Sequence, residues 1–368
     1  MNPSKAFGIV SLPSFSWSHS IRHIRISGQP VSRAASLHEL KKNLEPQDLL
    51  RGITYRSHIC KTGQARNMTT RSVHRVPIEP QQAARVVRSV LSGIDSLAKN
   101  VAIRDLGAAF CCTVGIGSEA WSSLTRIPKP AELHPFPAVH GQKHTAVSTP
   151  GDLLFHIRSE RRDLCFEFER QLLDALGDAV TVVDETTGFR YFDVRDLLGF
   201  VDGTANPVGT AVPDSVLIAE EDENATGGSY VVVQKYVHDV KAWNGLSTEQ
   251  QESIIGRKKL DNVELDDVAA GQQQSHKSLA TIEDENGEEH DILRDNMPFG
   301  SPGSGEFGTY FIGYSRRLWV IERMLQRMFI GNPPGLHDRL LDFSTPLTGI
   351  TFFAPSSVFL KRLGREDE

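Results

Sequence analysis

Strand-like and helix-like segments alternate along this chain of 368 residues in two series of similar order and spacing. In residues 79–98 the apolar side chains recur every three or four positions, which predicts an amphipathic helix with one buried face. Further helices are expected over 161–176, 240–246, 248–255 and 317–329, and strands over 108–114, 152–158, 180–183, 189–192, 229–236, 308–314 and 349–353. Two such series predict an α+β fold of two related halves, although no sequence repeat is obvious.

Changes in composition suggest where these halves begin and end. An acidic, glycine-rich stretch near the middle of the chain is typical of an exposed linker or flap. We expect a first half over 76–207, a linker over 208–228, a second half over 229–361 and a tail over 362–368.

The first 75 residues differ in charge from the rest of the chain. They contain twelve Lys and Arg against three Asp and Glu, and residues 1–38 have no acidic residue. An acid-free start rich in Arg and Ser is typical of a transit peptide, but also of a disordered leader or of sequence upstream of the true start, for which Met68 is a candidate. We therefore expect residues 1–75 to be a leader or disordered extension outside the folded body.

Charge and cysteine content argue against several classes of partner. The net charge is −6, and after residue 75 there are 28 Lys and Arg against 43 Asp and Glu. An acidic body argues against nucleic acid, and no apolar run approaches the ~18 residues that a membrane helix needs. The four cysteines show neither metal-ligand spacing nor a disulfide framework, which fits a reducing compartment. We expect a cytoplasmic protein, or a mitochondrial or other organellar one if the extension is a transit peptide.

The most informative short stretch runs from Gly199 to Pro207, with the sequence GFVDGTANP. Gly199 and Gly203 permit backbone angles closed to other residues and let another group approach the main chain. Asn206-Pro207 sets a turn, so Asp202 is presented on a tight loop. From residue types alone, this acid either caps its own backbone or serves a functional site.

Two later positions carry side chains that suit a chemical site. His276 lies in a polar stretch without periodicity, and Arg294 is followed two residues later by Asn296. Taken singly, a loop histidine is usually exposed to solvent and an arginine before an acid usually forms a surface ion pair. The combination is more informative than either residue.

Together these features resemble the dye-decolorizing peroxidases, in the form of the bacterial B-type branch. The shared pattern is Gly199-x-x-Asp202-Gly203, then a histidine about 70 to 75 residues later, then Arg294-x-Asn296. The flanking sequence agrees from about residue 107 to 361, in the segments CTVGIGS at 112–118, AELHPFP at 131–137, GDLLFHIR at 151–158 and GTYFIGY at 308–314.

The resemblance implies one haem b per chain, bound in the second of two ferredoxin-like halves that form a dimeric α+β barrel type of fold. His276 is then the proximal iron ligand, and Asp202, Arg294 and Asn296 lie on the distal, peroxide-binding side. Arg257 is expected to pair with a haem propionate, Asp342 to bond the outer ring nitrogen of His276, and Gly203 to let the macrocycle approach the backbone.

Relatives usually open the first half with an apolar strand. Residues 69–78 make a poor strand, so either residues 49–60 supply it or the strand is missing.

The implied activity is a peroxidase that uses hydrogen peroxide to oxidise dyes, phenolics or similar small aromatic one-electron donors. Asp202, with an ordinary pKa of about 3.9, would be ionised at neutral pH unless buried, which predicts an acidic optimum. Arg294 would stabilise the charge that develops as the O–O bond breaks. Surface aromatics offer a route for electrons, although packing is the preferred interpretation for most of Tyr230, Tyr236, Trp243, Tyr310 and Tyr314.

Other functions stay open at this point. One alternative is a haem-binding or iron-releasing protein of the same fold, and another is a non-enzymatic interaction protein in which these residues are incidental. The resemblance also implies a homo-oligomer. Loading into a protein shell through the segment 359–364 is possible, but this segment is short and charged, and we do not favour it.

Overall fold

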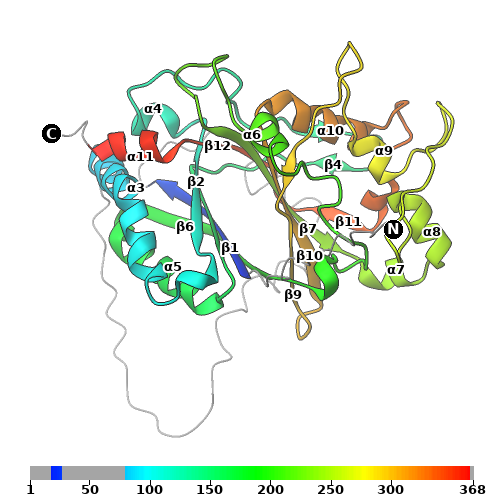
Figure 1. The fold of residues 1–368 in the computed structure, drawn as a ribbon, viewed down its shortest axis with the longest axis horizontal. Helices are drawn as coiled ribbons and strands as arrows, with labels where there is room; N and C mark the ends of the chain where they lie inside the picture. Colours follow the sequence, from blue (N-terminus) through cyan, green and yellow to red (C-terminus); the bar gives the residue numbers. More distant parts are fainter. Residues whose placement is uncertain (1–17, 27–78, 365–368) are drawn as a thin grey trace, which may run out of the picture.

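A computed structural model describes residues 18–26 and 79–364, which fold around one continuous antiparallel sheet (Figure 1). The strand order is β6-β1-β5-β2-β12-β7-β10-β8, with β9 paired to β10 and β11 paired to β7. In Figure 1, helices α3, α5 and α11 lie with the first half of this sheet, and α7 to α10 lie with the second. No helix of the described segments is both long and apolar enough to span a membrane.

The first half has the order strand–helix–strand–strand–helix–strand. Its elements are β1 (Ser18–Ile26), α3 (Pro80–Ala102), β2 (Cys111–Gly117), β5 (Leu153–Ser159), α5 (Arg162–Leu176) and β6 (Val180–Phe189), with the short α4 (Trp121–Leu124), β3 (Val139–His140) and β4 (Thr145–Ala146) inserted after β2. The first strand lies between the third and fourth, as β6-β1-β5-β2, which is a ferredoxin-like arrangement. The strand expected at 180–183 continues to Phe189 as β6. The separate strand expected at 189–192 is absent, because β6 ends at Phe189 and a 3₁₀ turn begins at Phe192.

The position of β1 corrects the prediction for the N-terminal region. Residues 1–75 were expected to lie outside the folded body, but β1 pairs with both β5 and β6, so this is wrong for 18–26. The side chains of Ile21 and Ile24 have no exposed surface. The neighbouring Arg22 and His23 are buried too. Because these two residues are polar, the sequence lacks the apolar pattern by which a buried strand is predicted. The alternative segment 49–60 lies outside the described residues.

Buried partners explain why these two polar side chains are tolerated in β1. Arg22 Nη2 donates to Glu169 Oε2 at 2.6 Å, and His23 Nε2 lies 2.6 Å from the hydroxyl oxygen of Tyr310. A buried charge or imidazole is costly unless it is bonded in this way. Glu169 lies on α5 and Tyr310 on a strand of the second half, so β1 connects both halves.

The second half repeats the same order. Its elements are β7 (Ser229–His238), α7 (Val240–Asn244), α8 (Thr248–Ile255), α9 (His276–Ala280), β8 (Leu293–Arg294), β9 (Met297–Ser301), β10 (Glu306–Ser315), α10 (Leu318–Ile330), β11 (Ser344–Pro346), β12 (Ile350–Ala354) and α11 (Ser357–Leu363). The order β12-β7-β10-β8 again places the first strand between the third and fourth. The halves join where β12 pairs with β2, so the expected α+β fold of two ferredoxin-like halves is confirmed.

Two segments expected to be peripheral pack onto the body. The stretch 208–228 contains helix α6 (Ala211–Val216), and Ile218 is buried. At the C-terminal end, α11 buries Phe359, whose ring centroid is 5.4 Å from that of Trp121. The segment considered for shell loading is therefore largely occupied by contacts within this chain.

Candidate active site

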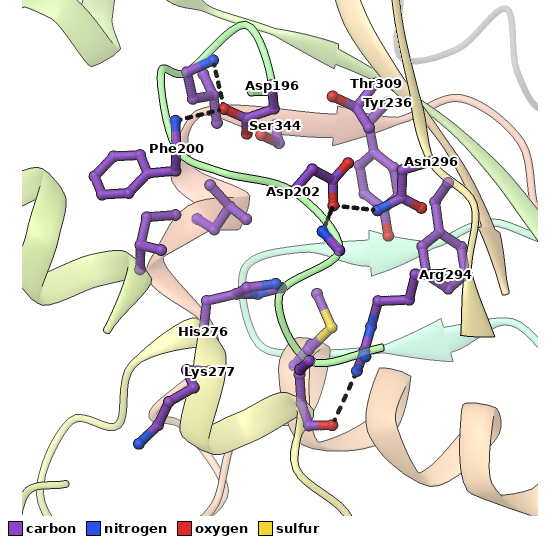
Figure 2. Close-up of a pocket in the computed structure, with 18 of the residues that line it drawn as sticks. Asp196, Phe200, Asp202, Tyr236, His276, Lys277, Arg294, Asn296, Thr309 and Ser344 are labelled. Carbon is purple, nitrogen blue, oxygen red and sulfur yellow. Dashed lines mark hydrogen bonds between the residues drawn. The ribbon is translucent and has the colours of Figure 1, made fainter. Parts of the chain in front are cut away.

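A cavity with about 1230 Å³ of empty space, its open mouth included, lies between the second half and the loop that follows β6. Cofactor and small-molecule sites commonly enclose roughly 300–1,000 Å³, so this one has room for a large ligand. The polar residues that line it include Asp196, Asp202, Gln234, His238, Arg257, His276, Arg294, Asn296, Thr309 and Ser344. Figure 2 shows several of them converging on one space, from the loop after β6, from α9 and from the strands of the sheet.

The loop that carries Asp202 is held in a narrow turn. The backbone N–H of Asp196 donates to the carbonyl of Phe200 at 2.9 Å, and its carboxylate accepts from Phe200 N at 2.9 Å. Gly199 has a φ of 93°, and a Cβ there would lie 2.6 Å from Lys259 Cε. Gly203 has a φ of 71°, which also favours glycine. The expected tight, glycine-dependent loop is therefore present.

Asp202 is bonded on the cavity wall rather than free in solvent. Its Oδ1 accepts from Gly203 N at 2.7 Å and from Asn296 Nδ2 at 3.2 Å (Figure 2). Burial raises the pKa of the Asp202 carboxyl, while these two donors and the charge of Arg294 act in the opposite direction and favour the ionised form. The loop acid is thus both a local cap and a member of the cavity.

Arg294 and Asn296 reach the same wall from β8 and the turn that follows it. Arg294 Nη2 contacts the carbonyl of Ala280 at 3.4 Å and Met324 Sδ at 3.6 Å. Burial lowers the pKa of the guanidinium, and the nearby Asp202 charge raises it. An arginine with such weak partners has donors to offer to an anionic ligand or to developing negative charge.

Asn206, which the sequence indicated only as part of a turn, holds Arg294 in place. Its Oδ1 accepts from Arg294 N at 2.8 Å, and its Nδ2 donates to Arg294 O at 2.7 Å. The Asn206 side chain therefore bonds both backbone groups of Arg294, as the backbone of a neighbouring strand would. The Asp202 loop and the arginine are fixed to each other through this contact.

His276 is the first residue of α9, after the N-cap Ser275. Its Nδ1 lies 2.6 Å from Asp338 Oδ2, and Asp338 has no exposed surface. Burial lowers the pKa of the imidazole, but the charge and hydrogen bond of Asp338 outweigh it, so the pKa is raised. Because a carboxylate only accepts, Nδ1 carries the proton of this bond and the Nε2 atom remains available to a ligand.

The predicted partner of His276, Asp342, is wrong. Asp342 lies one turn further along the 3₁₀ helix Arg339–Asp342 and bonds Lys143, His144 and His337 instead. Asp338 is the N-cap of that helix and points to His276, while its Oδ1 accepts from Leu340 N at 2.9 Å. The sequence Asp338-Arg-Leu-Leu-Asp342 offers two acids four residues apart, and only the helix phase decides which one faces the histidine.

Two other predicted residues lie at the cavity. Arg257 lines it with 17% of its side chain exposed, and it bonds Glu264 Oε2 at 2.6 Å. Gly203 lines it too, but a Cβ there would first meet Asn206 Nδ2 at 3.1 Å. Glycine is therefore favoured at position 203 by the positive backbone φ and by the close approach of the Asn206 side chain.

Asp196 is a cavity residue that sequence reasoning missed. Burial, together with the charge of the neighbouring Asp202, raises the pKa of its carboxyl to about 7. The only sequence feature that could have indicated Asp196 was its position six residues before Asp202.

The aromatic residues considered as electron carriers are all buried: Tyr230, Tyr236, Trp243, Tyr310 and Tyr314. This agrees with the packing interpretation.

The residues present fit a haem group. One imidazole is supported by a carboxylate and leaves Nε2 available, as an axial iron ligand requires. The walls include apolar side chains such as Phe311, Met324 and Leu325, which suit a flat macrocycle. A ferredoxin-like pair of domains with this imidazole and a carboxylate–amide–guanidinium group in one cavity defines a haem peroxidase of the α+β class.

Comparison with known proteins identifies the family. The models of the Dyp-type peroxidase N-terminal and C-terminal regions match residues 39–190 and 193–359. A dye-decolorizing peroxidase of Rhodococcus erythropolis is 53% identical over 276 residues, 75% of this chain and 81% of that protein. One of Mycobacterium tuberculosis is 54% identical over 274 residues, covering 74% and 82%. The chain belongs to the Dyp-type peroxidase family.

Solved structures agree with this assignment. DyPB from Rhodococcus jostii RHA1 is 47% identical with a TM-score of 0.77, covering 95% of this chain and 96% of that one. The encapsulated DyP-type peroxidase from Mycobacterium smegmatis is 42% identical with a TM-score of 0.77, covering 95% and 96%. A variant of the Rhodococcus jostii protein was solved in complex with heme. The chain is accordingly a haem-dependent peroxidase, an oxidoreductase that uses hydrogen peroxide.

Proposed function

We propose that His276 Nε2 is the axial iron ligand of one haem b in this cavity, and that Asp202, Arg294 and Asn296 act on peroxide. The observation that carries the proposal is the 2.6 Å contact between His276 Nδ1 and the buried Asp338, which leaves Nε2 for iron. Bound haem supplies the centre at which peroxide is reduced and from which electrons are drawn out of the reductant. The remaining chemistry belongs to the side chains.

Asp202 is the proton carrier in this proposal. Its ionised carboxylate accepts a proton from one peroxide oxygen and returns it to the other, as general acid–base catalysis requires. Asn296, 3.2 Å from Asp202 Oδ1, orients the carboxylate and favours its ionised form. Arg294, charged throughout the working range, stabilises the negative charge that develops as the O–O bond breaks.

Asp338 and Arg257 have supporting roles. Asp338 fixes the ring orientation of His276 and increases its strength as a donor. Arg257, at the cavity and only partly exposed, is suited to pair with a haem propionate. The reductants we propose are dyes, phenolics or similar small aromatic donors, in keeping with the name shared by the relatives.

Two substitutions test the assignment. His276→Ala should remove iron ligation, measured as loss of the Soret spectrum of the wild type and of peroxide-dependent dye oxidation. His140→Ala, which changes an exposed histidine on β3, is the matched control and should alter neither. A wild-type spectrum and turnover in His276→Ala would contradict the proposal.

Arg294→Leu separates a peroxidase from a protein that only binds haem or releases its iron. We expect haem to be retained and turnover to fall by about 10²–10³, the usual effect of removing one stabilising donor. A binding protein would be indifferent to this change. The presence of the Asp202, Arg294 and Asn296 group in one cavity favours the enzyme.

We also propose a cytoplasmic homo-oligomer. The described cysteines Cys111 and Cys112 are free, which fits a reducing compartment. An organelle is the alternative if an N-terminal segment acts as a transit peptide, and cell fractionation would decide. Shell loading, by analogy with the encapsulated relative, is less favoured because Phe359 and Leu360 are buried.

A further inference from the structure

A second group of ligand-type side chains lies outside the peroxide site. Asp342 Oδ1 is 3.0 Å from His144 Nε2 and 3.1 Å from His337 Nε2. One ligand atom of each of the three residues lies within 4.8 Å of the other two. The side chains are 16–20% exposed, so the group is accessible from solvent yet largely enclosed. None of the three lines the haem cavity.

Two imidazoles and one carboxylate are a ligand set that Zn²⁺ favours. Zinc bonds to nitrogen or oxygen measure about 2.0–2.2 Å, so tetrahedral ligands lie roughly 3.3–3.6 Å apart. The two N···O distances here are only a few tenths of an ångström shorter. Three protein ligands leave the fourth position to water.

We propose that His144, His337 and Asp342 bind a divalent transition-metal ion of the zinc type. Lys143 is the local competitor, because its Nζ lies 2.5 Å from Asp342 Oδ1 and its side chain is 59% exposed. The ammonium group is already a cation on the carboxylate oxygen that a metal would take. Its flexible, solvent-facing stem can swing away, so metal binding is an exchange of one cation for another.

The site would join parts of the chain that lie almost two hundred residues apart. His144 belongs to the β3–β4 hairpin, where its carbonyl accepts from Gly141 N at 2.9 Å. His337 directly precedes Asp338, the partner of His276, and its carbonyl accepts from Gln273 Nε2 at 3.0 Å. A bound ion would therefore fix the hairpin to the segment that supports the proximal histidine.

The test is zinc binding to the chelator-washed, haem-loaded enzyme, with bound zinc counted by mass spectrometry after equilibrium dialysis. We expect one more zinc per chain in the wild type than in His337→Gln. Loss of a ligand should weaken binding by at least ~100-fold, beyond the 10–100-fold typical of outer-shell changes. His140→Gln, in the same hairpin, is the control and should keep the ion; Mg²⁺, which prefers oxygen ligands, should not displace zinc.

Lys143→Gln keeps the test informative if His337→Gln folds poorly. Removing the competing ammonium should tighten zinc binding several-fold, an effect that misfolding cannot imitate. Equal zinc content in the wild type and His337→Gln would overturn the proposal, as would unchanged affinity in Lys143→Gln. Zinc counting needs no peroxide turnover, so a negative result here is distinct from failure of the proposed peroxidase roles.

Discussion

Replacing Asp338 with asparagine should weaken the protein through a single contact. The substitution keeps the shape of the side chain and its bond to Leu340 N, but it turns the 2.6 Å contact with His276 Nδ1 from charge-assisted to neutral or repulsive. A hydrogen bond to a charged group contributes about 1.5–3 kcal/mol, so we expect the free energy of unfolding to fall by this amount. Asp338→Ala also loses the helix cap, worth about 1 kcal/mol more.

Denaturant unfolding of the haem-loaded protein measures this loss, and the reduction potential of the haem measures its electronic effect. With a less electron-rich imidazole on iron, the potential should become more positive. Asp239→Asn is the matched control, because Asp239 caps α7 through Ala242 N at 2.9 Å and is exposed. Asparagine caps helices as well as aspartate, so its effect should be small.

We would reject this role for Asp338 if Asp338→Asn unfolded within about 0.5 kcal/mol of the wild type, the range of ordinary surface changes, and kept its reduction potential. Such a result would mean that Asp338 does not act on His276. Another acid would then have to support His276, and Asp342 would again be a candidate.

Three further substitutions test the fold and the distal wall. Ile24→Ala should cost about 2–5 kcal/mol in denaturant unfolding because Ile24 is fully buried in β1, whereas Ile103→Ala, 73% exposed, should stay within ~0.5. Asn296→Ala removes a donor that favours ionised Asp202, so the pKa of that acid should rise and the acid limb of kcat/KM for peroxide should move to higher pH. Asn206→Ala should lower kcat while haem content, measured by absorbance, stays unchanged, because only the backbone of the distal arginine is released.

Periodicity and turn residues were enough to predict most of the fold. The helix starting near residue 80 was predicted because its apolar side chains follow the helical period of one buried face. The strand starting near residue 229 is a short valine-rich run, and it is buried on both faces. β1 could not be predicted in this way. Its buried Arg22 and His23 have the composition of an exposed segment, and their partners, Glu169 and Tyr310, are distant in sequence.

Most of the site residues were predicted through local sequence patterns shared with the family, and not from the residue types alone. Asp202 between two glycines and Arg294 close to Asn296 are local patterns, and all these side chains line one cavity. The partner of His276 was not predictable, since Asp338 and Asp342 differ only in their phase on one short helix. Only the three-dimensional structure distinguishes them, because each acid lies near a histidine and each is bonded to it.

The proposed distal group, Asp202, Arg294 and Asn296, depends on the way the two halves meet. Asp202 belongs to a loop that leaves the first half, and Arg294 belongs to a strand of the second. Asn206 bonds both backbone groups of Arg294, and Asn296 bonds the Asp202 carboxylate, so each half holds a residue that the other half uses. A shift of one half against the other would move the proposed proton carrier, Asp202, and the proposed charge-stabilising group, Arg294, together. Substitutions of Asp202 and Arg294 should therefore not be additive, as expected for residues that act as a unit.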